Sequence, residues 1–230
     1  MPEPRTPRTS ESHPLRIDSI QARSDWGAIG MSLCPGKDQA DGLSGHWQRD
    51  LGTDLERIRI WGAAFVVSLM ERHEFAELGV EALPAEALRL GMAWRHLPIP
   101  DRQPPGPAFE ARWPEVGAEL VVALREGRRI FLHCKGGLGR TGTVAACLLR
   151  EAGVGAAEAV TQVRLARPKT IETAQQERYV RAYTRCAGGN PCIKARRWLK
   201  PPRSPSTHSP SAPGAPPPAP APPRCRPPPG

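Results

Sequence analysis

A segment of nine residues, His133–Thr141 (HCKGGLGRT), combines a thiol, a guanidinium and three glycines. A cysteine near cations or a helix N-terminus loses its proton more readily than a free cysteine, and the thiolate can attack the phosphorus of a phosphate ester. Arg140 lies six positions after Cys134, and its planar guanidinium can hold two phosphate oxygens. The segment therefore predicts cysteine-dependent cleavage of phosphate esters, with Cys134 as the nucleophile and Arg140 as the phosphate-binding cation.

The glycines of this segment suit a loop that surrounds a phosphate. Such a loop turns its backbone N–H groups inward, which needs backbone angles that residues with a Cβ resist. The helix expected after the loop adds the positive end of its dipole, which favours anions. The predicted phosphate-binding loop consists of Lys135, Gly136, Gly137, Leu138, Gly139 and Arg140.

Two residues that flank the loop are expected to support the nucleophile. Thr141 can donate a hydrogen bond to the thiolate, which makes the sulfur a better leaving group when water attacks the phosphoenzyme. We expect His133 to order the loop and stabilise the thiolate rather than to act as a base. The alternative is a glycine-rich turn around a buried structural cysteine, which does not require His, Cys, Arg and Thr at these positions.

Strands and helices alternate around the segment. The continuous apolar run over 63–69 is typical of a buried parallel strand, residues 129–133 are expected to form the next strand before the loop, and further strands are expected within 17–33 and 92–99. Thr53 is expected to cap a helix that ends near Trp61, with Glu56 completing a capping box. Other helices are expected over 72–79, 84–90, 109–126, 141–151, 156–165 and 172–186. The pattern predicts an α/β fold with a mostly parallel central sheet flanked by helices.

The composition predicts one folded domain with two extensions. The chain has 230 residues, of which 39% are hydrophobic. Residues 1–14 are rich in Pro, Ser, Thr and Arg, and residues 188–230 hold 15 of the 28 prolines and no acidic residue. Such segments bury too little apolar surface to offset the entropy of ordering, so we predict that both are disordered. The phosphatase domain is then expected over residues 15–187.

Charge and cysteine spacing bear on partners and cofactors. Seven basic residues of the tail account for most of the net charge of +9, so the charge is weak evidence for nucleic-acid binding and none is expected. The cysteines have no zinc-binding spacing, and we expect no metal or other cofactor. Without an apolar N-terminal stretch or an apolar run near 18 residues, we expect a cytoplasmic protein with reduced cysteines and no membrane contact. The tail can bind an unknown partner or form a solvated linker.

The segment resembles the protein tyrosine phosphatase superfamily, whose pattern is His-Cys-x5-Arg-Ser/Thr. The chain is similar to the short dual-specificity branch. Its loop sequence GGLGRT and the run IGMSLCPG over 29–36 look most like the kinase-associated phosphatase (cyclin-dependent kinase inhibitor type) subgroup. The resemblance covers about residues 17–185 and implies the dual-specificity phosphatase-like fold.

The resemblance also implies a general acid on a separate loop. By chain position this is Asp101, in a proline-rich loop after a strand, where a carboxylic acid can close over the substrate and protonate the leaving oxygen. The structural alternative is a turn aspartate beside prolines, and Asp54 at a predicted helix start is a rival carboxylate. The family also carries a later polar residue that places the hydrolytic water, for which Gln176 aligns better than Gln175.

Several substrate classes stay open. We expect phosphotyrosine, phosphoserine or phosphothreonine on a protein, hydrolysed through a cysteinyl-phosphate. Lys135 resembles the loop of inositol-phosphate phosphatases in the same superfamily, so an inositol phosphate or a small phosphorylated metabolite is an alternative, although Leu138 replaces the second lysine of that loop. Arg167 and Lys169 can contact an acidic substrate or serve as solvated surface residues.

Two rivals belong to other functional classes. An arsenate reductase or a rhodanese-like sulfurtransferase also uses a thiolate in an anion-binding loop, but neither chemistry needs Asp101 together with Thr141. A catalytically weak phosphate-binding module that works through its tail is the other rival, and the intact set of catalytic residue types argues against it.

Overall fold

The computed structural model describes residues 6–42 and 45–185. The elements are β1 (Asp18–Ile20), β2 (Ile29–Ser32), β3 (Asp38–Gly42), β4 (Gly45–Gln48), α1 (Leu51–Ile60), β5 (Ala63–Ser68), α2 (Arg72–Glu77), α3 (Leu83–Arg89), β6 (Ala93–His96), α4 (Pro107–Arg125), β7 (Arg129–His133), α5 (Gly139–Glu151), α6 (Ala156–Ala166) and α7 (Ala174–Ala182). No helix in these two ranges is both long and apolar enough to cross a membrane.

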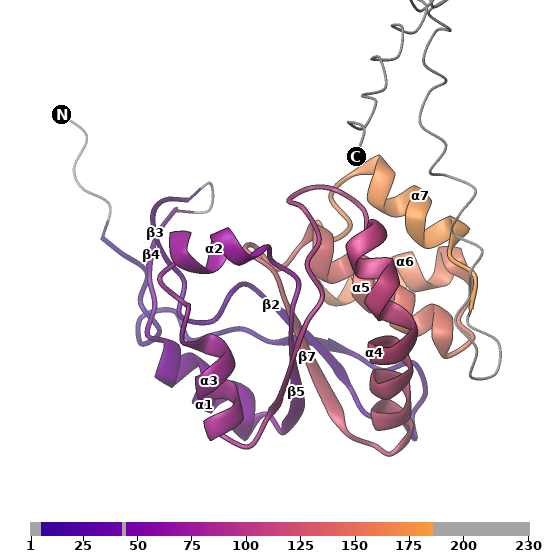
Figure 1. Cartoon of the computed structure of the whole chain (residues 1–230), viewed down its shortest axis with the longest axis horizontal. Coiled ribbons are helices and arrows are strands. Elements are labelled where there is room, and N and C mark those ends of the chain that lie inside the picture. Colours follow the sequence, from indigo (N-terminus) through magenta and orange to yellow (C-terminus); the bar gives the residue numbers. More distant parts are fainter. Residues whose placement is uncertain (1–5, 43–44, 186–230) are drawn as a thin grey trace, which may run out of the picture. The chain divides into compact units, whose positions relative to one another are not determined.

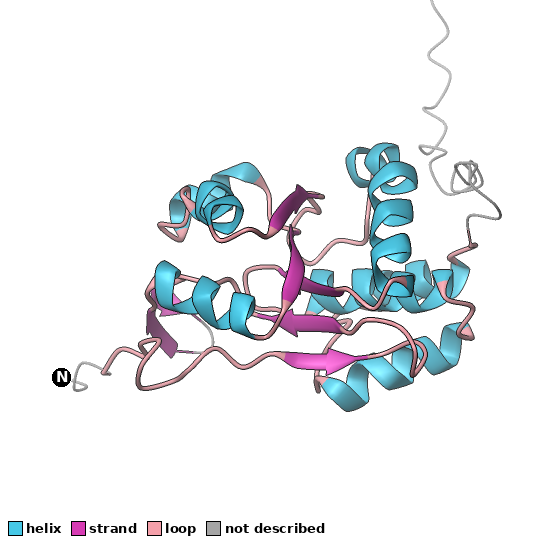
Figure 2. Ribbon diagram, turned by 90° about the horizontal axis from the view of Figure 1, so that it is seen from below, coloured by secondary structure: helices cyan, strands magenta, loops and turns pink. Residues whose placement is uncertain are grey.

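Five strands form a central sheet in the order β1-β2-β7-β5-β6 (Figures 1 and 2). Strands β2, β7, β5 and β6 are parallel, and β1 is an antiparallel edge strand. Ile130, Phe131 and Leu132 of the central strand β7 are fully buried, as expected for a strand covered on both faces. The prediction of an α/β fold with a mostly parallel sheet is confirmed.

Helices cover both faces of this sheet. Figure 1 shows α1–α3 on one side and α4–α7 on the other, with α1 against β5 and α5 against β2 and β7. Every residue of α5 from Gly139 to Leu149 is buried, because the helix also contacts α4, α6 and α7. The loop between β7 and α5 is therefore fixed at both ends by core elements.

The parallel strands bring four connections to the same edge of the sheet. Strand β7 leads into residues 134–138, β2 into residues 33–37, β5 into the loop before α2, and β6 into the loop that reaches Asp101. Ligands of open α/β sheets bind outside the carboxyl ends of the strands. The sequence-predicted residues thus lie at the edge where a site is expected.

The first helix starts earlier than predicted. Helix α1 begins at Leu51, and the side chain of Asp50 accepts a hydrogen bond from the Thr53 backbone N–H at 2.7 Å. The prediction of Thr53 as N-cap with Glu56 in a capping box is wrong, because Asp50 already caps the helix. Glu56 instead accepts hydrogen bonds from the Arg59 guanidinium. The hairpin β3–β4 was not expected, because its exposed Gly- and Asp-containing residues show no apolar alternation.

Part of the N-terminal segment packs against the domain. The Arg8 N–H donates to the carbonyl of His46, and the Arg8 carbonyl accepts from the N–H of Gln48. Ser10 is buried, and its hydroxyl accepts from the Asp50 N–H at 3.0 Å. The contacts of the domain thus begin before residue 15. The predictions for residues 1–5 and for the tail 188–230 lie outside the described residues.

Candidate active site

Cys134 directly follows β7 and is 3% exposed. Its Sγ accepts a hydrogen bond from the backbone N–H of Gly137 at 3.2 Å. Helix α5 begins at Gly139, with Leu138 as its N-cap, so the sulfur lies near the first turn of the helix. Backbone N–H groups and the positive end of a helix dipole stabilise an anion at such a place.

The glycines of the loop have different roles. Gly137 has a φ of +72°, and a Cβ there would lie 2.2 Å from the carbonyl oxygen of Ser32. A Cβ at Gly139 would lie 2.5 Å from the Glu172 carboxylate, which accepts the Gly139 N–H at 2.8 Å. Gly136 faces open space. Both its backbone angle and the nearby backbone of Ser32 therefore require glycine at Gly137, whereas a Cβ at Gly139 would displace only the ends of the Glu172 and Gln176 side chains.

Arg140 lies at the start of α5 and is almost fully buried. Its Nη1 and Nη2 donate to the two carboxylate oxygens of Glu74, at 2.5 and 2.9 Å. Nη1 also donates to the carbonyl of Ile99 at 3.2 Å, and Nη2 lies 2.8 Å from Oδ1 of Asp101. A guanidinium has five N–H donors. The Nε–H has no partner within the described chain and stays available for a phosphate oxygen.

Glu74 is a site residue that sequence reasoning missed. It projects from α2, is 3% exposed, and also accepts the backbone N–H of Glu71 at 2.8 Å. Burial by itself would raise the pKa of Glu74, but hydrogen bonds and the charge of Arg140 outweigh it and lower that pKa. The ionised carboxylate therefore fixes the guanidinium in one orientation. The sequence does not distinguish Glu74 from the exposed Glu77 one turn later.

We expect Glu74→Gln to destabilise the fold by about 3 kcal/mol, because it leaves the buried Arg140 charge without its main partner. Chemical denaturation measures this change. Glu77→Gln on the same helix is the matched control, since the Glu77 side chain is 52% exposed and its change should stay within about 0.5 kcal/mol. Equal losses in both variants would contradict the assigned role of Glu74.

Asp101 lies on the loop after β6, and its side chain is 61% exposed. The loop is held by hydrogen bonds from the Ile99 N–H to the Leu69 carbonyl and from the Gln103 N–H to the Pro100 carbonyl. The ion pair with Arg140 brings the Asp101 carboxylate to the phosphate-binding loop, and its role as the general acid, which the family resemblance implies, stays a prediction.

The rival carboxylate Asp54 has a structural role. Both its oxygens accept from the Arg49 guanidinium, at 2.7 and 2.8 Å, and one also accepts the Gly36 N–H at 2.9 Å. The pair is almost fully buried. Asp54 therefore fixes the connection after β2 and has no carboxylate oxygen directed to Cys134.

His133 is completely buried and belongs to a chain of hydrogen bonds. The Trp94 indole N–H donates to Oγ of Ser68 at 2.9 Å, and that hydroxyl lies 2.7 Å from Nε2 of His133. The hydroxyl, which accepts from Trp94, can donate its own proton to Nε2, and the imidazole proton is on Nδ1 in that arrangement. Nδ1 lies against the Cys134 backbone without a well-formed hydrogen bond among the described atoms. His133 thus orders the start of the loop.

The buried His133 predicts a pH dependence of stability. Burial lowers the pKa of His133 to about 3, and burial also lowers the pKa of His96. As the pH falls below about 6.5, the unfolded chain takes up these protons before the folded chain does. Stability is therefore complete above pH 6.5 and falls towards pH 3, by about 1.4 kcal/mol per pH unit for His133, and the lowered pKa of His96 adds to this loss.

Denaturation of wild type and His133→Gln between pH 7 and pH 5 measures this slope, and we expect the variant to decline less steeply. The exposed His73→Gln serves as the control and should follow wild type. Parallel curves for wild type and His133→Gln would contradict the prediction.

Thr141 and Gln176 are both buried, but only the Gln176 side chain has hydrogen-bond partners in the part of the chain that the structure describes. The Thr141 hydroxyl has no hydrogen-bond partner among the described residues, so the predicted bond to the Cys134 sulfur is not formed in this structure. Gln176 donates from Nε2 to the carbonyl of Gln103 at 3.1 Å, and its Oε1 accepts from the Thr173 N–H at 3.2 Å. Gln176 thus ties the start of α7 to the Asp101 loop, and a role in placing water stays a prediction.

Arg167 supports the loop from outside. It donates from Nε to the carbonyl of Gly137 at 2.6 Å and from Nη2 to the carbonyl of Gly136 at 3.3 Å, and its Nη1 pairs with Asp18 at 2.6 Å. The C=O and the next N–H of a trans peptide point in opposite directions. By holding these carbonyls outward, Arg167 turns the following N–H groups towards the phosphate position. This role differs from the expected substrate contact or solvated surface.

We expect Arg167→Met to lower kcat/KM for an aryl phosphate about tenfold, because the N–H groups lose their fixed orientation and small misplacements are costly. Steady-state kinetics measures the effect. Arg181→Met is the control, since Arg181 is a half-exposed residue of α7 that pairs with Glu177. If the two variants have equal kcat/KM, Arg167 does not position the loop.

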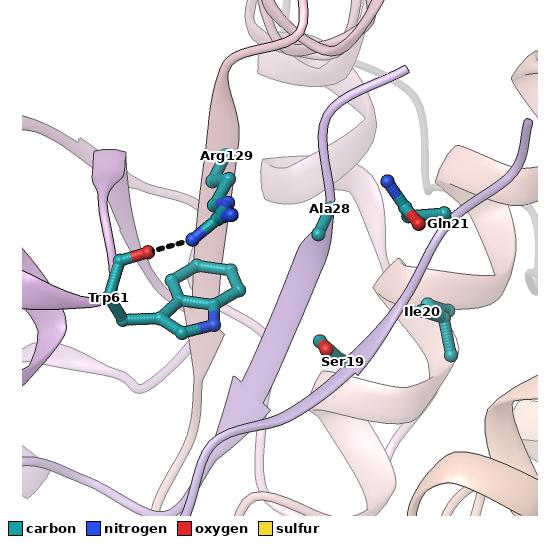
Figure 3. Close-up of a pocket in the computed structure, with 6 residues that line it drawn as sticks. All are labelled: Ser19, Ile20, Gln21, Ala28, Trp61 and Arg129. Carbon is teal, nitrogen blue, oxygen red and sulfur yellow. Dashed lines mark hydrogen bonds between the residues drawn. The ribbon is translucent and has the colours of Figure 1, made fainter. Parts of the chain in front are cut away.

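A separate cavity lies at the opposite edge of the sheet (Figure 3). It has a volume of about 240 Å³ and is lined by the end of β1 and by Ala28, Trp61 and Arg129, which lie at the amino ends of the parallel strands. The Arg129 guanidinium donates to the Trp61 carbonyl. Because Cys134 follows the carboxyl end of β7, this cavity does not belong to the site around it.

Comparisons with known proteins agree with this geometry. The family model described as "PTP-SAK: Swiss Army Knife protein, DSP-PTPase phosphatase domain" matches residues 48–180, which include Glu74, Asp101 and the whole segment 133–141. Cyclin-dependent kinase inhibitor 3 of Rattus norvegicus is 34% identical over 102 residues, which is 44% of this chain and 47% of that relative. The chain thus spans about half the length of the curated relatives it matches.

Solved structures are similar in fold. A crystal structure of kinase-associated phosphatase, with its catalytic-site cysteine substituted by serine, has a TM-score of 0.64 and 25% identity, and covers 76% of this chain and 93% of that chain. The active form of Tk-PTP has a TM-score of 0.53 and 26% identity, and covers 70% of this chain and 92% of that chain.

Proposed function

This chain belongs to the DSP-PTPase family of cysteine-dependent phosphatases, and we propose that it dephosphorylates phosphoproteins through a cysteinyl-phosphate at Cys134. The predicted resemblance to this family, near the kinase-associated phosphatase subgroup, is confirmed. The observation that carries the mechanism is the meeting of three groups at one sheet edge. These are the Cys134 thiol in its loop, the Arg140 guanidinium fixed by Glu74, and the Asp101 carboxyl group within 2.8 Å of Arg140.

The first step forms the S–P bond. The substrate phosphoryl group binds the loop N–H groups and the free Nε–H of Arg140, and it displaces Asp101 from Nη2, which supplies a second donor on the same edge of the guanidinium. The Cys134 thiolate attacks phosphorus, and the bond to the leaving oxygen breaks. Asp101, in its acid form, gives its proton to that oxygen, so the product leaves as an alcohol or phenol.

The second step breaks the S–P bond. Water attacks the phosphorus of the cysteinyl-phosphate, and the Asp101 carboxylate takes a proton from that water. The electron pair of the S–P bond returns to sulfur, which regenerates the thiolate and releases inorganic phosphate. The Thr141 hydroxyl is the proposed hydrogen-bond donor to that thiolate. It has no hydrogen-bond partner in the described part of this structure, so it must move towards the sulfur to take this role.

Turnover of a substrate panel tests the proposal. Phosphate release is measured with phosphotyrosine, phosphoserine and phosphothreonine peptides and with inositol phosphates, in the presence of a chelator. We expect hydrolysis of phosphopeptides. Hydrolysis of inositol phosphates alone would assign the alternative substrate class, which Lys135 favours. Binding of phosphopeptides by wild type without any turnover would instead identify a phosphate-binding module.

A further inference from the structure

Lys37 is a buried lysine that the mechanism above does not use. It lies in the connection between β2 and β3 and is 4% exposed. Across the part of the chain that the structure describes, its ammonium has no hydrogen bond and no carboxylate partner. An unpaired ammonium with little access to water costs free energy, so the charges of buried side chains are normally paired. A buried cation that lacks a protein partner indicates an anion that the protein binds.

The connection around Lys37 is held firmly beside the phosphate-binding loop. The Gly36 N–H donates to Asp54, the Lys37 carbonyl accepts from the Arg49 N–H at 3.1 Å, and the Asp38 N–H donates to the Leu78 carbonyl at 3.0 Å. On the side of the nucleophile, the Cys34 N–H donates to the carbonyl of Lys135 at 3.4 Å. Lys37 therefore cannot leave the edge of the sheet where Cys134 lies without breaking these contacts.

The titratable groups that act on Lys37 lie in or beside the site. Its electrostatic neighbours are the thiols of Cys34 and Cys134 and the ammonium of Lys135. Burial is the main cause that lowers the pKa of Lys37, and the like charge of Lys135 adds to it. Cys34 is buried and its pKa is raised by that burial, so it stays a neutral thiol. The negative charge that can face Lys37 is therefore that of the reacting centre at Cys134.

The other cations near the loop already have carboxylate partners. Arg140 is paired with Glu74 and Asp101, and Lys135 lies 3.3 Å from Glu77. A phosphate monoester brings two negative charges to a site whose guanidinium is largely neutralised. Lys37, in contrast, is a cation of this edge without a carboxylate partner among the described residues.

We propose that Lys37 is a positioning residue that supplies a buried positive charge to the phosphoryl group bound at Cys134. The proposal rests on the function proposed above and adds a charge from outside the nine-residue segment. Because the ammonium lacks a partner in the free protein, it lowers the free energy of unfolding. A bound phosphate would pair with the ammonium and raise the free energy of unfolding again. Stability and phosphate affinity should therefore change in opposite directions when the charge is removed.

Lys37→Met, Lys37→Arg and wild type test this relation with inorganic phosphate as the probe. Thermal unfolding is measured over a series of phosphate concentrations, because a ligand that binds only the folded state raises Tm by an amount that increases with the logarithm of its concentration divided by Kd. For Lys37→Met we expect a Tm without phosphate at or above that of wild type. We also expect about tenfold weaker phosphate binding, and a KM for aryl phosphate that rises more than kcat falls.

Lys37→Arg keeps the charge and should bind phosphate within about threefold of wild type. Arg23→Met removes an exposed cation elsewhere and should leave phosphate binding unchanged. A lowered Tm with unchanged phosphate affinity in Lys37→Met would overturn the proposal in favour of a purely structural lysine. If Lys37→Met does not fold, tenfold weaker phosphate binding by a folded Lys37→Arg would also overturn it. Phosphate binding needs no turnover, so a wild type without phosphatase activity would reject the proposed function and still allow this test.

Discussion

Replacement of Cys134 by serine is expected to lower phosphate release from an aryl phosphate by at least about 10⁴-fold, the scale seen when a covalent nucleophile is removed. A serine hydroxyl at this position has no general base to take its proton, because Asp101 is needed as the acid in the same step. The fold should be unaffected, since the substitution changes one atom of a residue that contacts Gly137 through its side chain. Steady-state kinetics and thermal unfolding of the same samples measure both effects.

Cys34→Ser is the matched control for this substitution. Cys34 is buried at the same sheet edge, and its thiol donates to the carbonyl of Pro35 at 3.4 Å. A hydroxyl can donate to the same carbonyl, so Cys34→Ser should keep phosphatase activity within a few-fold of wild type. Turnover by Cys134→Ser above about one per cent of wild type would contradict the assignment of the nucleophile.

Asp101→Asn is expected to lower kcat for a phosphoserine peptide by about 10² to 10⁴-fold, the contribution of a general acid. The amide of Asn has the shape of the carboxyl group and can form hydrogen bonds, but it has no acidic proton to transfer to the leaving oxygen. The loss should be much smaller for an aryl phosphate with an acidic phenol, because that leaving oxygen departs without a proton. The ion pair of Asp101 with Arg140 involves an exposed carboxylate, so stability should change by less than about 1 kcal/mol.

Asp54→Asn separates this catalytic effect from the loss of a carboxylate in general. Its buried pair with Arg49 predicts a marked fall in Tm, whereas kcat of the folded protein should keep the wild-type dependence on the leaving group. If Asp101→Asn loses the same factor on phosphoserine and on the aryl phosphate, Asp101 is not the general acid.

The elements next to the nucleophile could be predicted from the sequence because their signals are local. Residues 129–133 form a strand with the predicted bounds, and the following helix begins at Gly139, two residues before the predicted start. Both carry apolar patterns that are independent of the rest of the chain. Asp101 was predicted through the family resemblance, because its distance from Arg140 depends on how β6 and β7 are arranged in the sheet.

The residues that complete the site could not be predicted in this way. Glu74 is 66 positions away from Arg140 in the chain, and nothing local marks it as buried. Arg167 acts through carbonyls of residues about 30 positions earlier, and Lys37 lies in a loop that hydrogen bonds to distant parts of the chain hold at the sheet edge. Charged residues are normally interpreted as surface residues, so the burial of Glu74 and Lys37 and the contacts of the partly buried Arg167 could be found only from the tertiary structure.

Predictions that differ from the structure also depended on features that the local sequence does not determine. Asp50 precedes the expected cap Thr53 by three residues, and either residue type can cap a helix. The glycines of the loop look equivalent in sequence, but only Gly137 has a positive φ. Hydrogen bonds such as the one expected from Thr141 depend on side-chain positions of a few tenths of an ångström, which spacing along the chain does not determine.

Rapid-quench trapping of the intermediate tests the mechanism most directly. Wild type is mixed with excess aryl phosphate and quenched in acid within the first turnover, and its peptides are analysed by mass spectrometry. The mechanism predicts one added phosphoryl group on Cys134, which is absent from Cys134→Ser. Phosphate release by wild type with no phosphoryl group on Cys134, or with the group on another residue, would contradict it.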